Sequence, residues 1–326
     1  MNLQHLFRAC ICLFLSLILA ACNLIVPAQI EKTPLKITYN PWPGFLPLVI
    51  AKEKGFFTKQ GVNVEIFYVE DTQLQMADLG AGKYDGATLA LGSIVIISSK
   101  NHDLRVIFAS DESAGADAVV ASPSIGKIQD LKGKALGTGI GGFGELFAVK
   151  MLETANLTSE DVTLVNMDGE QVPARLKKGD IQAGQTWEPY VSQAAKSGAR
   201  VLFSSDRTPG LIPDVVAFQS SVLRDRPDDI KAFVRAWFQA AEYWKTHPAE
   251  GNAIIAKLLN VKADTISLEG IKLFSLSDNV KAFTPGNDTT SLYYTARLYA
   301  DFFVRSGGVT RPPDIDKLLD PSFLKS

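Results

Sequence analysis

Six short loops hold the side chains best suited to binding chemistry, and each follows residues typical of a β-strand: residues 40–45, 90–93, 111–117, 139–145, 187–190 and 211–214. Their acidic members are Asp111, Glu112, Asp117, Glu145, Glu188 and Asp214, and no lysine, arginine or histidine occurs in any of them. Carboxylates without basic partners repel an anion by about 1 kcal/mol or more each at partly buried distances. They accept hydrogen bonds from amines, and guanidinium or amidinium groups bind them through two parallel bonds. The loops therefore favour a small nitrogenous cation or amine.

Aromatic residues in the same loops could form flat walls for such a ligand. Trp42 and Phe45 lie in the stretch Asn-Pro-Trp-Pro-Gly-Phe, and Trp187 directly precedes Glu188. A well-placed ring stabilises a stacked cation by about 0.5–2 kcal/mol. Ser93 adds a hydroxyl in the second loop. The predicted ligand-binding residues are thus Trp42, Phe45, Ser93, Asp111, Glu112, Asp117, Glu145, Trp187, Glu188 and Asp214.

Each of these residues also has a structural interpretation. An acidic residue near a helix start often caps the helix or interacts with its dipole, which applies to Asp111, Glu112 and Asp214. Glu145 would lie one turn inside a helix and face water, and the aromatic rings could pack in the core. The sequence leaves both interpretations open.

Catalytic, metal and nucleic-acid chemistry find little support. Beyond the N-terminal segment the histidines are His102 and His247, and neither has a partner at metal-ligand spacing. The Gly-rich stretch at residues 137–144 lacks the Lys-Ser/Thr of a phosphate-binding loop. The formal net charge is −2, without a basic run that would bind nucleic acid. We expect a non-enzymatic protein with no metal and no cofactor.

The N-terminus has the features of a secretory signal. A short positive region precedes about a dozen apolar residues, too few for a comfortable membrane span. The run ends in Leu-Ala-Ala-Cys, which is similar to the lipobox of bacterial lipoproteins. We predict a signal peptide over residues 1–21, lipidation at Cys22 and a linker over residues 22–33. An ordinary signal peptide that contains a cysteine is the alternative.

Strand-like and helix-like segments alternate from Leu35 onward. Strands are expected over residues 35–40, 62–69, 85–91 and 104–112, and the alternation continues to about residue 205. Long helices follow over residues 226–259, 263–276 and 289–307, and Pro248 should divide the first of these. This order predicts an α/β protein with mostly parallel sheets, and ligands in such folds bind beyond the carboxyl ends of strands.

Several short motifs resemble one known group. They are Trp-Pro-Gly-Phe after the first strand, AKEKGFF, GVNVEI, KGKALGT, TWEPY and LLDPSFL, in addition to the lipobox. In this order they are similar to periplasmic solute-binding proteins of ABC importers, in the branch for nitrate, sulfonates, taurine and thiamine precursors. The resemblance implies a two-lobed type II binding fold with crossovers near residues 114–118 and 214–220. The first lobe would then comprise residues 34–116 and 218–326, and the second residues 117–217.

The resemblance also implies a function and partners. A monomeric, lipid-anchored protein outside the cytoplasmic membrane would close its lobes on a small molecule and deliver it to an ABC permease and ATPase. Thiamine-pyrimidine synthases share the fold, but they rely on histidine and a cysteine-rich motif that this chain lacks. The main expectation is a guanidine-, amidine- or aminopyrimidine-like ligand. The alternatives are a small anion, such as a sulfonate, taurine or nitrate, and an extracytoplasmic sensor domain.

Overall fold

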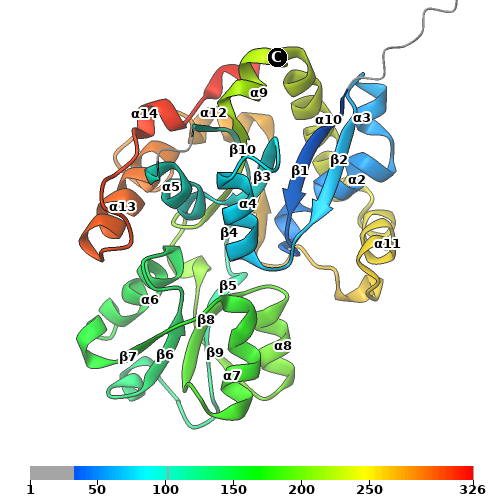
Figure 1. Cartoon of the computed structure of the whole chain (residues 1–326). Helices are drawn as coiled ribbons and strands as arrows, with labels where there is room; N and C mark the ends of the chain where they lie inside the picture. The colour runs from blue at the N-terminus through cyan, green and yellow to red at the C-terminus, as the bar shows by residue number, and fades with distance from the viewer. Residues whose placement is uncertain (1–32, 101–102, 326) are drawn as a thin grey trace, which may run out of the picture. The chain divides into compact units, whose positions relative to one another are not determined.

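Two β-sheets form the framework of residues 33–100 and 103–325, the part of the chain that the computed structural model describes (Figure 1). The first sheet has the strand order β11-β4-β10-β3-β1-β2, and the second has the order β7-β6-β8-β5-β9. The strands are β1 Leu35–Tyr39, β2 Val64–Tyr68, β3 Gly86–Ala90, β4 Leu104–Ser113, β5 Asp117–Ala121, β6 Ala135–Thr138, β7 Thr163–Asn166, β8 Ala183–Trp187, β9 Arg200–Ser204, β10 Pro213–Gln219 and β11 Ile271–Leu273.

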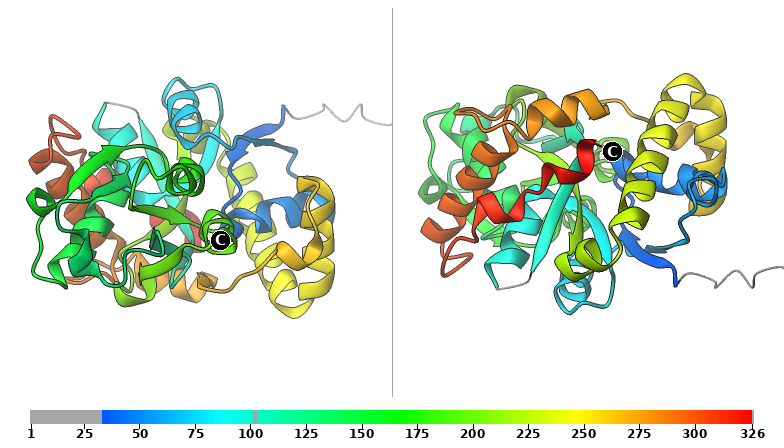
Figure 2. Two further views of the ribbon diagram at one scale, coloured as in Figure 1. Left: turned by 90° about the horizontal axis from the view of Figure 1, so that it is seen from below. Right: turned by 90° about the horizontal axis from the view of Figure 1, so that it is seen from above.

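Helices cover both faces of the first sheet. Those on one side include α10 and α11, and those on the other include α13 and α14 (Figure 2). The helices of the two lobes are α2 Pro47–Glu53, α3 Phe56–Lys59, α4 Thr72–Gly80, α5 Leu91–Ser99, α6 Phe143–Glu153, α7 Val172–Lys178, α8 Tyr190–Lys196, α9 Ser220–Asp225, α10 Pro227–Thr246, α11 Pro248–Leu259, α12 Leu276–Ala282, α13 Leu292–Arg305 and α14 Ile315–Leu318. Pro248 divides the long helical segment into α10 and α11, as predicted.

The sequence of α10, the longest of the described helices, explains both where this helix begins and which of its faces is buried. Pro227 occupies its first turn, where the missing N–H has no partner to lose, and acidic residues follow in the same turn. Phe233, Trp237 and Trp244 recur on one face and are fully buried. The ring of Trp237 packs 5.2 Å from that of Phe108 on β4, between ring centroids. These aromatic residues therefore belong to the core, as their spacing predicts.

The chain crosses twice between the sheets. It leaves the first sheet after β4, forms β5 to β9 in the second sheet, and returns as β10 between β3 and β4. The α/β fold and both crossovers are confirmed. The lobe boundaries themselves stay a prediction, and β10, which begins at Pro213, pairs within the first sheet.

Both sheets are mixed, whereas the alternation predicts mostly parallel ones. β10 runs antiparallel to β3 and β4, and β5 runs antiparallel to β8 and β9. The reason is that β5 and β10 are the strands that receive the chain from the other sheet. No helix crossover within the same sheet precedes them, so the rule that makes neighbouring strands parallel does not apply.

The helix predicted over residues 263–276 is wrong. A short 3₁₀ turn is followed there by β11, which pairs with β4. Gly270 has φ +73°, which interrupts any helix, and its carbonyl accepts hydrogen bonds from the backbone N–H groups of Ala114 and Ala116. An added Cβ would lie 2.6 Å from the Ala116 nitrogen. Apolar residues alternate with polar ones at Ile266 and Leu268 and again at Ile271 and Leu273, which suits an extended chain equally well.

The predicted signal peptide, Cys22 and most of the linker lie outside the described residues. Among the helices that the structure describes, none is long and apolar enough to span a membrane.

Candidate ligand-binding pocket

The turn after β1 carries two of the predicted aromatic residues. Pro43 begins the short 3₁₀ helix Pro43–Phe45, which holds the chain in a fixed bend. The backbone N–H of Trp42 donates to Oδ1 of Asn40 at 3.0 Å, and the Asn40 amide donates to Gln75 at 3.2 Å. The rings of Trp42 and Phe45 are buried. Local sequence and two hydrogen bonds therefore fix this turn before any ligand arrives.

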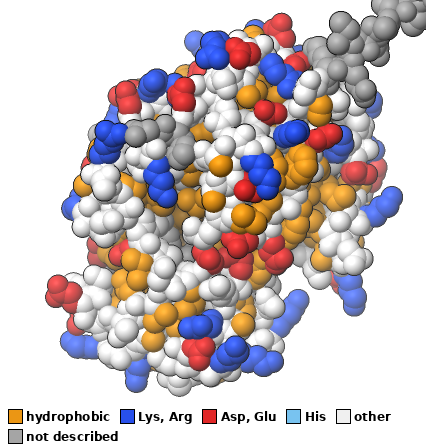
Figure 3. All heavy atoms as spheres, in the orientation of Figure 1, with side chains coloured by type: hydrophobic (Ala, Val, Ile, Leu, Met, Phe, Trp, Pro, Cys, Tyr) orange, Lys and Arg blue, Asp and Glu red, His pale blue; other side chains and the backbone are white. Residues whose placement is uncertain are grey.

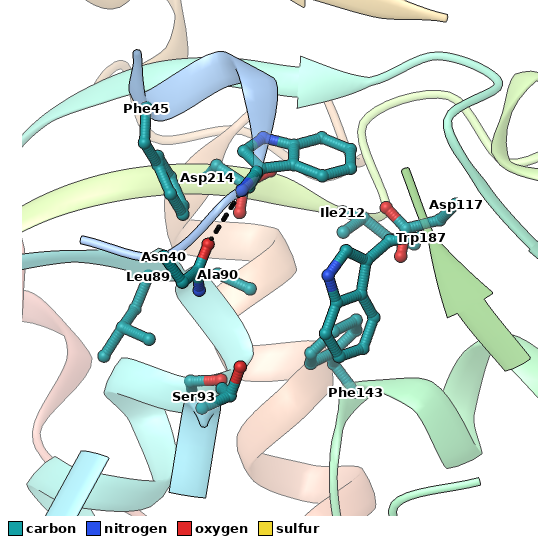
Figure 4. A pocket seen from close by; sticks show the side chains of 12 residues that line it. Asn40, Phe45, Leu89, Ala90, Ser93, Asp117, Phe143, Trp187, Ile212 and Asp214 are labelled. Atoms are coloured by element: carbon teal, nitrogen blue, oxygen red, sulfur yellow. Dashed lines mark hydrogen bonds between the residues drawn. The ribbon is translucent and has the colours of Figure 1, made fainter. Parts of the chain in front are cut away.

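A small pocket lies at this turn. It is lined by residues from both sheets and the helices beside them: Asn40, Trp42, Phe45, Thr72, Leu89, Ala90, Ser93, Asp117, Phe143, Trp187, Ile212 and Asp214. Figure 4 shows Phe45 and Leu89 on one side, Trp187 and Phe143 on the other, and Ser93 below. The pocket is small: its volume of about 30 Å³ leaves room for one or two water molecules.

A larger cavity of about 690 Å³ adjoins the pocket. Thr72, Ser93, Phe143 and Trp187 line both spaces. The larger cavity also contacts α4, the Gly-rich loop before α6, and Lys100. A few ligand atoms can therefore reach the buried end, and the remainder of a ligand can lie in the cavity.

Two carboxyl groups line the buried end. Asp117 is 2% exposed and Asp214 is 5% exposed, whereas no lysine, arginine or histidine lines this pocket in the part of the chain that is described. Asp117 Oδ1 accepts a hydrogen bond from Gln185 Nε2 at 3.2 Å. Its backbone N–H donates to Ser113 Oγ at 2.9 Å. The structure thus brings together acids from the amino ends of β5 and β10, whereas the strand-tip argument concerns carboxyl ends.

Burial makes both acids hard to ionise. It raises the pKa of Asp117 to about 7, although hydrogen bonds from Ser113 and Gln185 oppose the shift. Burial, followed by the negative charges of Asp111 and Asp117, raises the pKa of Asp214 well above its ordinary value. Because each carboxylate needs a positive partner or a proton, a cationic ligand would replace the proton.

Trp187 forms a flat wall on the second-lobe side. Its ring centroid lies 6.4 Å from Phe143 and 6.1 Å from Tyr190. Gly169 permits this position, because an added Cβ there would lie 2.2 Å from the indole. Packing on three sides therefore holds the ring in place.

Two helices begin at the pocket. The residue before α5 is Ala90 and the residue before α6 is Gly142, and neither gives its helix a side-chain cap. Ala90 and Phe143 both line the pocket. The backbone N–H groups of a helix N-terminus can hold an anion, so the site also offers donors.

Four predicted residues lie outside the lining of this pocket. Asp111 is fully buried behind the turn, where its Oδ1 accepts from Trp42 Nε1 at 2.9 Å. Glu112 pairs with Lys272 at 3.3 Å. Glu145 accepts from the Gly141 N–H at 2.6 Å, and Glu188 accepts from the N–H and hydroxyl of Ser192 on α8. Each of these four carboxyls has a partner within the protein.

Sequence reasoning missed several lining residues, among them Asn40, Thr72, Leu89, Phe143 and Ile212. All but Thr72 and Leu89 belong to the six loops. Thr72 opens α4 directly after the β2 loop, which was not among the six. The strand-tip rule, applied to the end of β2 as well, would have found it.

Hydrogen bonds link the two lobes beside the pocket. Thr72 Oγ1 donates to Glu170 Oε1 at 2.9 Å, and Gln73 Nε2 donates to Asp168 Oδ1 at 3.1 Å. The Tyr190 hydroxyl donates to Glu70 Oε1 at 3.1 Å. We call these three hydrogen bonds, Thr72–Glu170, Gln73–Asp168 and Tyr190–Glu70, the interlobe latch.

Figure 3 shows acidic side chains gathered in the middle of the face that it displays.

A family comparison connects this geometry with known proteins. The model of the family described as "NMT1/THI5 like" matches residues 42–251, which include most of the pocket. The chain belongs to the NMT1/THI5-like family. The match begins at Trp42 and extends through both crossovers.

Relatives of this family member cover nearly the whole chain. A putative aliphatic sulfonates-binding protein of Bacillus subtilis (strain 168) is 24% identical over 94% of this chain and 92% of its own length. The periplasmic aliphatic sulphonate-binding protein of Escherichia coli is 17% identical, with a TM-score of 0.72 and coverage of 87% and 91%. The periplasmic nitrate-binding protein of Synechocystis PCC 6803 is 14% identical, with a TM-score of 0.73 and coverage of 90% and 88%. The resemblance to periplasmic solute-binding proteins is confirmed, as is the fold.

Proposed function

We propose that this NMT1/THI5-like protein is the periplasmic substrate-binding protein of an ABC importer and binds a small molecule rather than transforming it. The observation that carries the proposal is the pocket itself, which is built from both sheets. Trp42 and Asp214 come from the first sheet and its loops, and Asp117 and Trp187 come from the second. A ligand that contacts both lobes stabilises their closed arrangement, which a permease can recognise. The whole-length relatives, binding proteins by name, support this function.

The charges in the pocket support a flat nitrogenous cation or amine as the ligand. Asp117 and Asp214 can each accept hydrogen bonds from N–H groups, and Trp42 and Trp187 offer faces for stacking. The small volume of the buried end suits a guanidinium, an amidinium or the amino edge of a pyrimidine.

A small anion is the second candidate, and the comparisons favour it. The relatives are named for sulfonates and nitrate. Two uncapped helix N-termini reach the pocket, and Lys100 lines the adjoining cavity. With the raised pKa values of Asp117 and Asp214, protonated carboxyls could donate to an anion's oxygens.

A thermal-shift screen distinguishes the two ligand classes. The domain from residue 23 onward is tested against guanidine, amidines, amines and aminopyrimidines, and against taurine, alkanesulfonates and nitrate, at pH 6 and pH 8. A bound ligand raises the unfolding midpoint by mass action. A cation should bind more tightly at pH 8, because it needs ionised carboxylates, and an anion more tightly at pH 6. No shift with any compound would contradict a small-molecule binding function.

Anchoring and partners complete the proposal. We propose that lipid on Cys22 anchors a monomer outside the cytoplasmic membrane, where it delivers ligand to a permease and ATPase. Cys22→Ala should release the protein from the membrane fraction, and an unchanged membrane fraction would refute lipidation. A sensor role would instead leave uptake of the identified ligand unchanged when the gene is deleted.

A further inference from the structure

Asp111 on β4 is a fully buried carboxyl that does not line the pocket. Its Oδ2 accepts from the Ser110 hydroxyl at 2.7 Å, and its Oδ1 accepts from the indole Nε1–H of Trp42 at 2.9 Å. The first bond is local, whereas the second crosses to the turn that follows β1. Asp111 therefore contacts a pocket wall from behind.

The same carboxyl presses against the backbone of that turn. A Cβ added to Gly44 would lie between 2.1 and 2.5 Å from the three carboxyl atoms of Asp111. Only glycine leaves this space, so the Trp-Pro-Gly-Phe sequence and Asp111 fit together as a unit. This fit fixes the plane of the Trp42 ring, because its single N–H has one acceptor in a fixed place.

Asp111 also contacts the acid at the buried end of the pocket. Asp111 and Asp214 are direct partners in the register of β4 and β10, and both side chains are buried. Directly opposed residues have Cβ atoms about 5 Å apart, and two buried carboxyls at that separation cannot both be ionised without a positive partner, so one of them carries a proton. The other ionisable groups around the pair are Glu112, which pairs with Lys272, Asp117, and the Tyr299 phenol, which donates to the Leu211 carbonyl.

We propose that Asp111 is a positioning residue that controls two walls of the pocket at once, the indole of Trp42 and the protonation of Asp214. Asp111 keeps the negative charge and accepts from both sides, while Asp214 keeps the shared proton in the absence of ligand. An incoming N–H donor at Asp214 then displaces that proton, and the ring of Trp42 stays in place. The inference rests on the proposed function in taking this pocket as the ligand site, but its test needs no ligand.

The test follows the indole N–H resonances of the ¹⁵N-tryptophan-labelled protein from pH 4 to pH 8.5. Trp42→Phe identifies the Trp42 resonance by its loss. In the unsubstituted protein this resonance should move with pH, because its acceptor belongs to the titrating pair. Asp111→Asn keeps an acceptor for the indole and offers Asp214 an amide donor in place of a carboxylate. The pH midpoint of the Trp42 resonance should therefore fall by at least one unit or the step should disappear.

Asp111→Leu and Glu112→Gln complete the design. Leu has a similar volume but no acceptor, so the Trp42 resonance should shift and exchange faster with water. Glu112→Gln removes the charge that contributes least to the raised pKa of Asp111, so it should lower the pH midpoint far less than Asp111→Asn does. An unchanged pH profile in Asp111→Asn overturns the inference, even when Asp111→Leu fails to fold. A failed ligand screen with the expected resonance shifts would refute the proposed function alone.

Discussion

Replacing Asp117 by Asn should make the ligand-free protein more stable at neutral pH. Asp117 is buried and its pKa is about 7, compared with about 3.9 for an unfolded chain. Between these values the native state binds more protons than the unfolded state, so the contribution of Asp117 to stability is present below pH 4 and is lost as the pH rises through 7. Asn has no ionisable group, so the stability of the Asp117→Asn variant lacks this dependence on pH.

The size of the effect follows from the shift in pKa. About three units correspond to about 4 kcal/mol of unfolding free energy at pH 8, which is the upper bound for the gain. At pH 4 the two proteins should differ by less than about 1 kcal/mol, because native Asp117 is neutral and the unfolded side chain is only about half ionised. Urea unfolding monitored by circular dichroism at pH 4, 6 and 8 measures the difference. Asp301→Asn on the exposed face of α13 is the matched control and should leave the stability unchanged at every pH.

The same substitution should weaken the binding of a cation. A hydrogen bond to a charged group contributes about 1.5–3 kcal/mol, so the dissociation constant should rise about tenfold or more. In the unsubstituted protein, cation affinity should fall about fivefold between pH 7 and pH 6, as protonation of a group with a pKa of about 7 requires. A variant that is less stable at pH 8, or that keeps the original pH slope, would refute the reasoning.

Three further substitutions test the pocket, a helix cap and the interlobe latch, with calorimetry on the best compound of the screen. Trp187→Ala should raise the dissociation constant at least tenfold through the lost stacking surface, and an unchanged constant would remove Trp187 from the site. Glu188→Gln should reduce stability by about 0.5–1 kcal/mol while leaving affinity unchanged, because Glu188 caps α8; a tenfold loss of affinity would assign it to the ligand. Tyr190→Phe should weaken binding about three- to tenfold by removing its hydrogen bond to Glu70, and equal affinity would mean that the bond does not stabilise closure.

The sequence predicted the pocket where position along a strand decides the outcome. Trp187 stands at the carboxyl end of β8, as the strand-tip rule requires. Asp117 and Asp214 instead begin β5 and β10, and they reach the same pocket because these strands run antiparallel to their neighbours. Trp42 follows β1 and reaches the same place because Pro43 bends the chain there. In each case a local feature fixes the direction of the side chain.

The sequence was less informative where a nearby donor competes for the side chain. The Glu145 carboxylate accepts a hydrogen bond from the N–H of Gly141, and the Glu188 carboxylate accepts one from the N–H of Ser192. Both acids therefore find a hydrogen-bond donor four residues away in the chain. The sequence shows that a loop contains an acidic residue, but it does not show which hydrogen-bond donor the carboxylate will contact. The antiparallel placement of β10 was hidden for a similar reason, since it depends on pairing partners more than 100 residues earlier in the chain.

The position of β10 also has a consequence for the order of assembly during synthesis. The pairings of the second sheet all lie between Asp117 and Ser204, so this sheet can close as soon as that segment is available. The first sheet cannot, because β3 and β4 are joined only through β10. Strands β3 and β4 are synthesised before β10, so their backbone hydrogen-bonding groups on that side stay unpaired until β10 is available. Unpaired strand edges of this kind promote aggregation. Slow steps and aggregation during refolding should therefore originate in the first lobe, and a chain that stops before Pro213 should leave β4 without a partner strand.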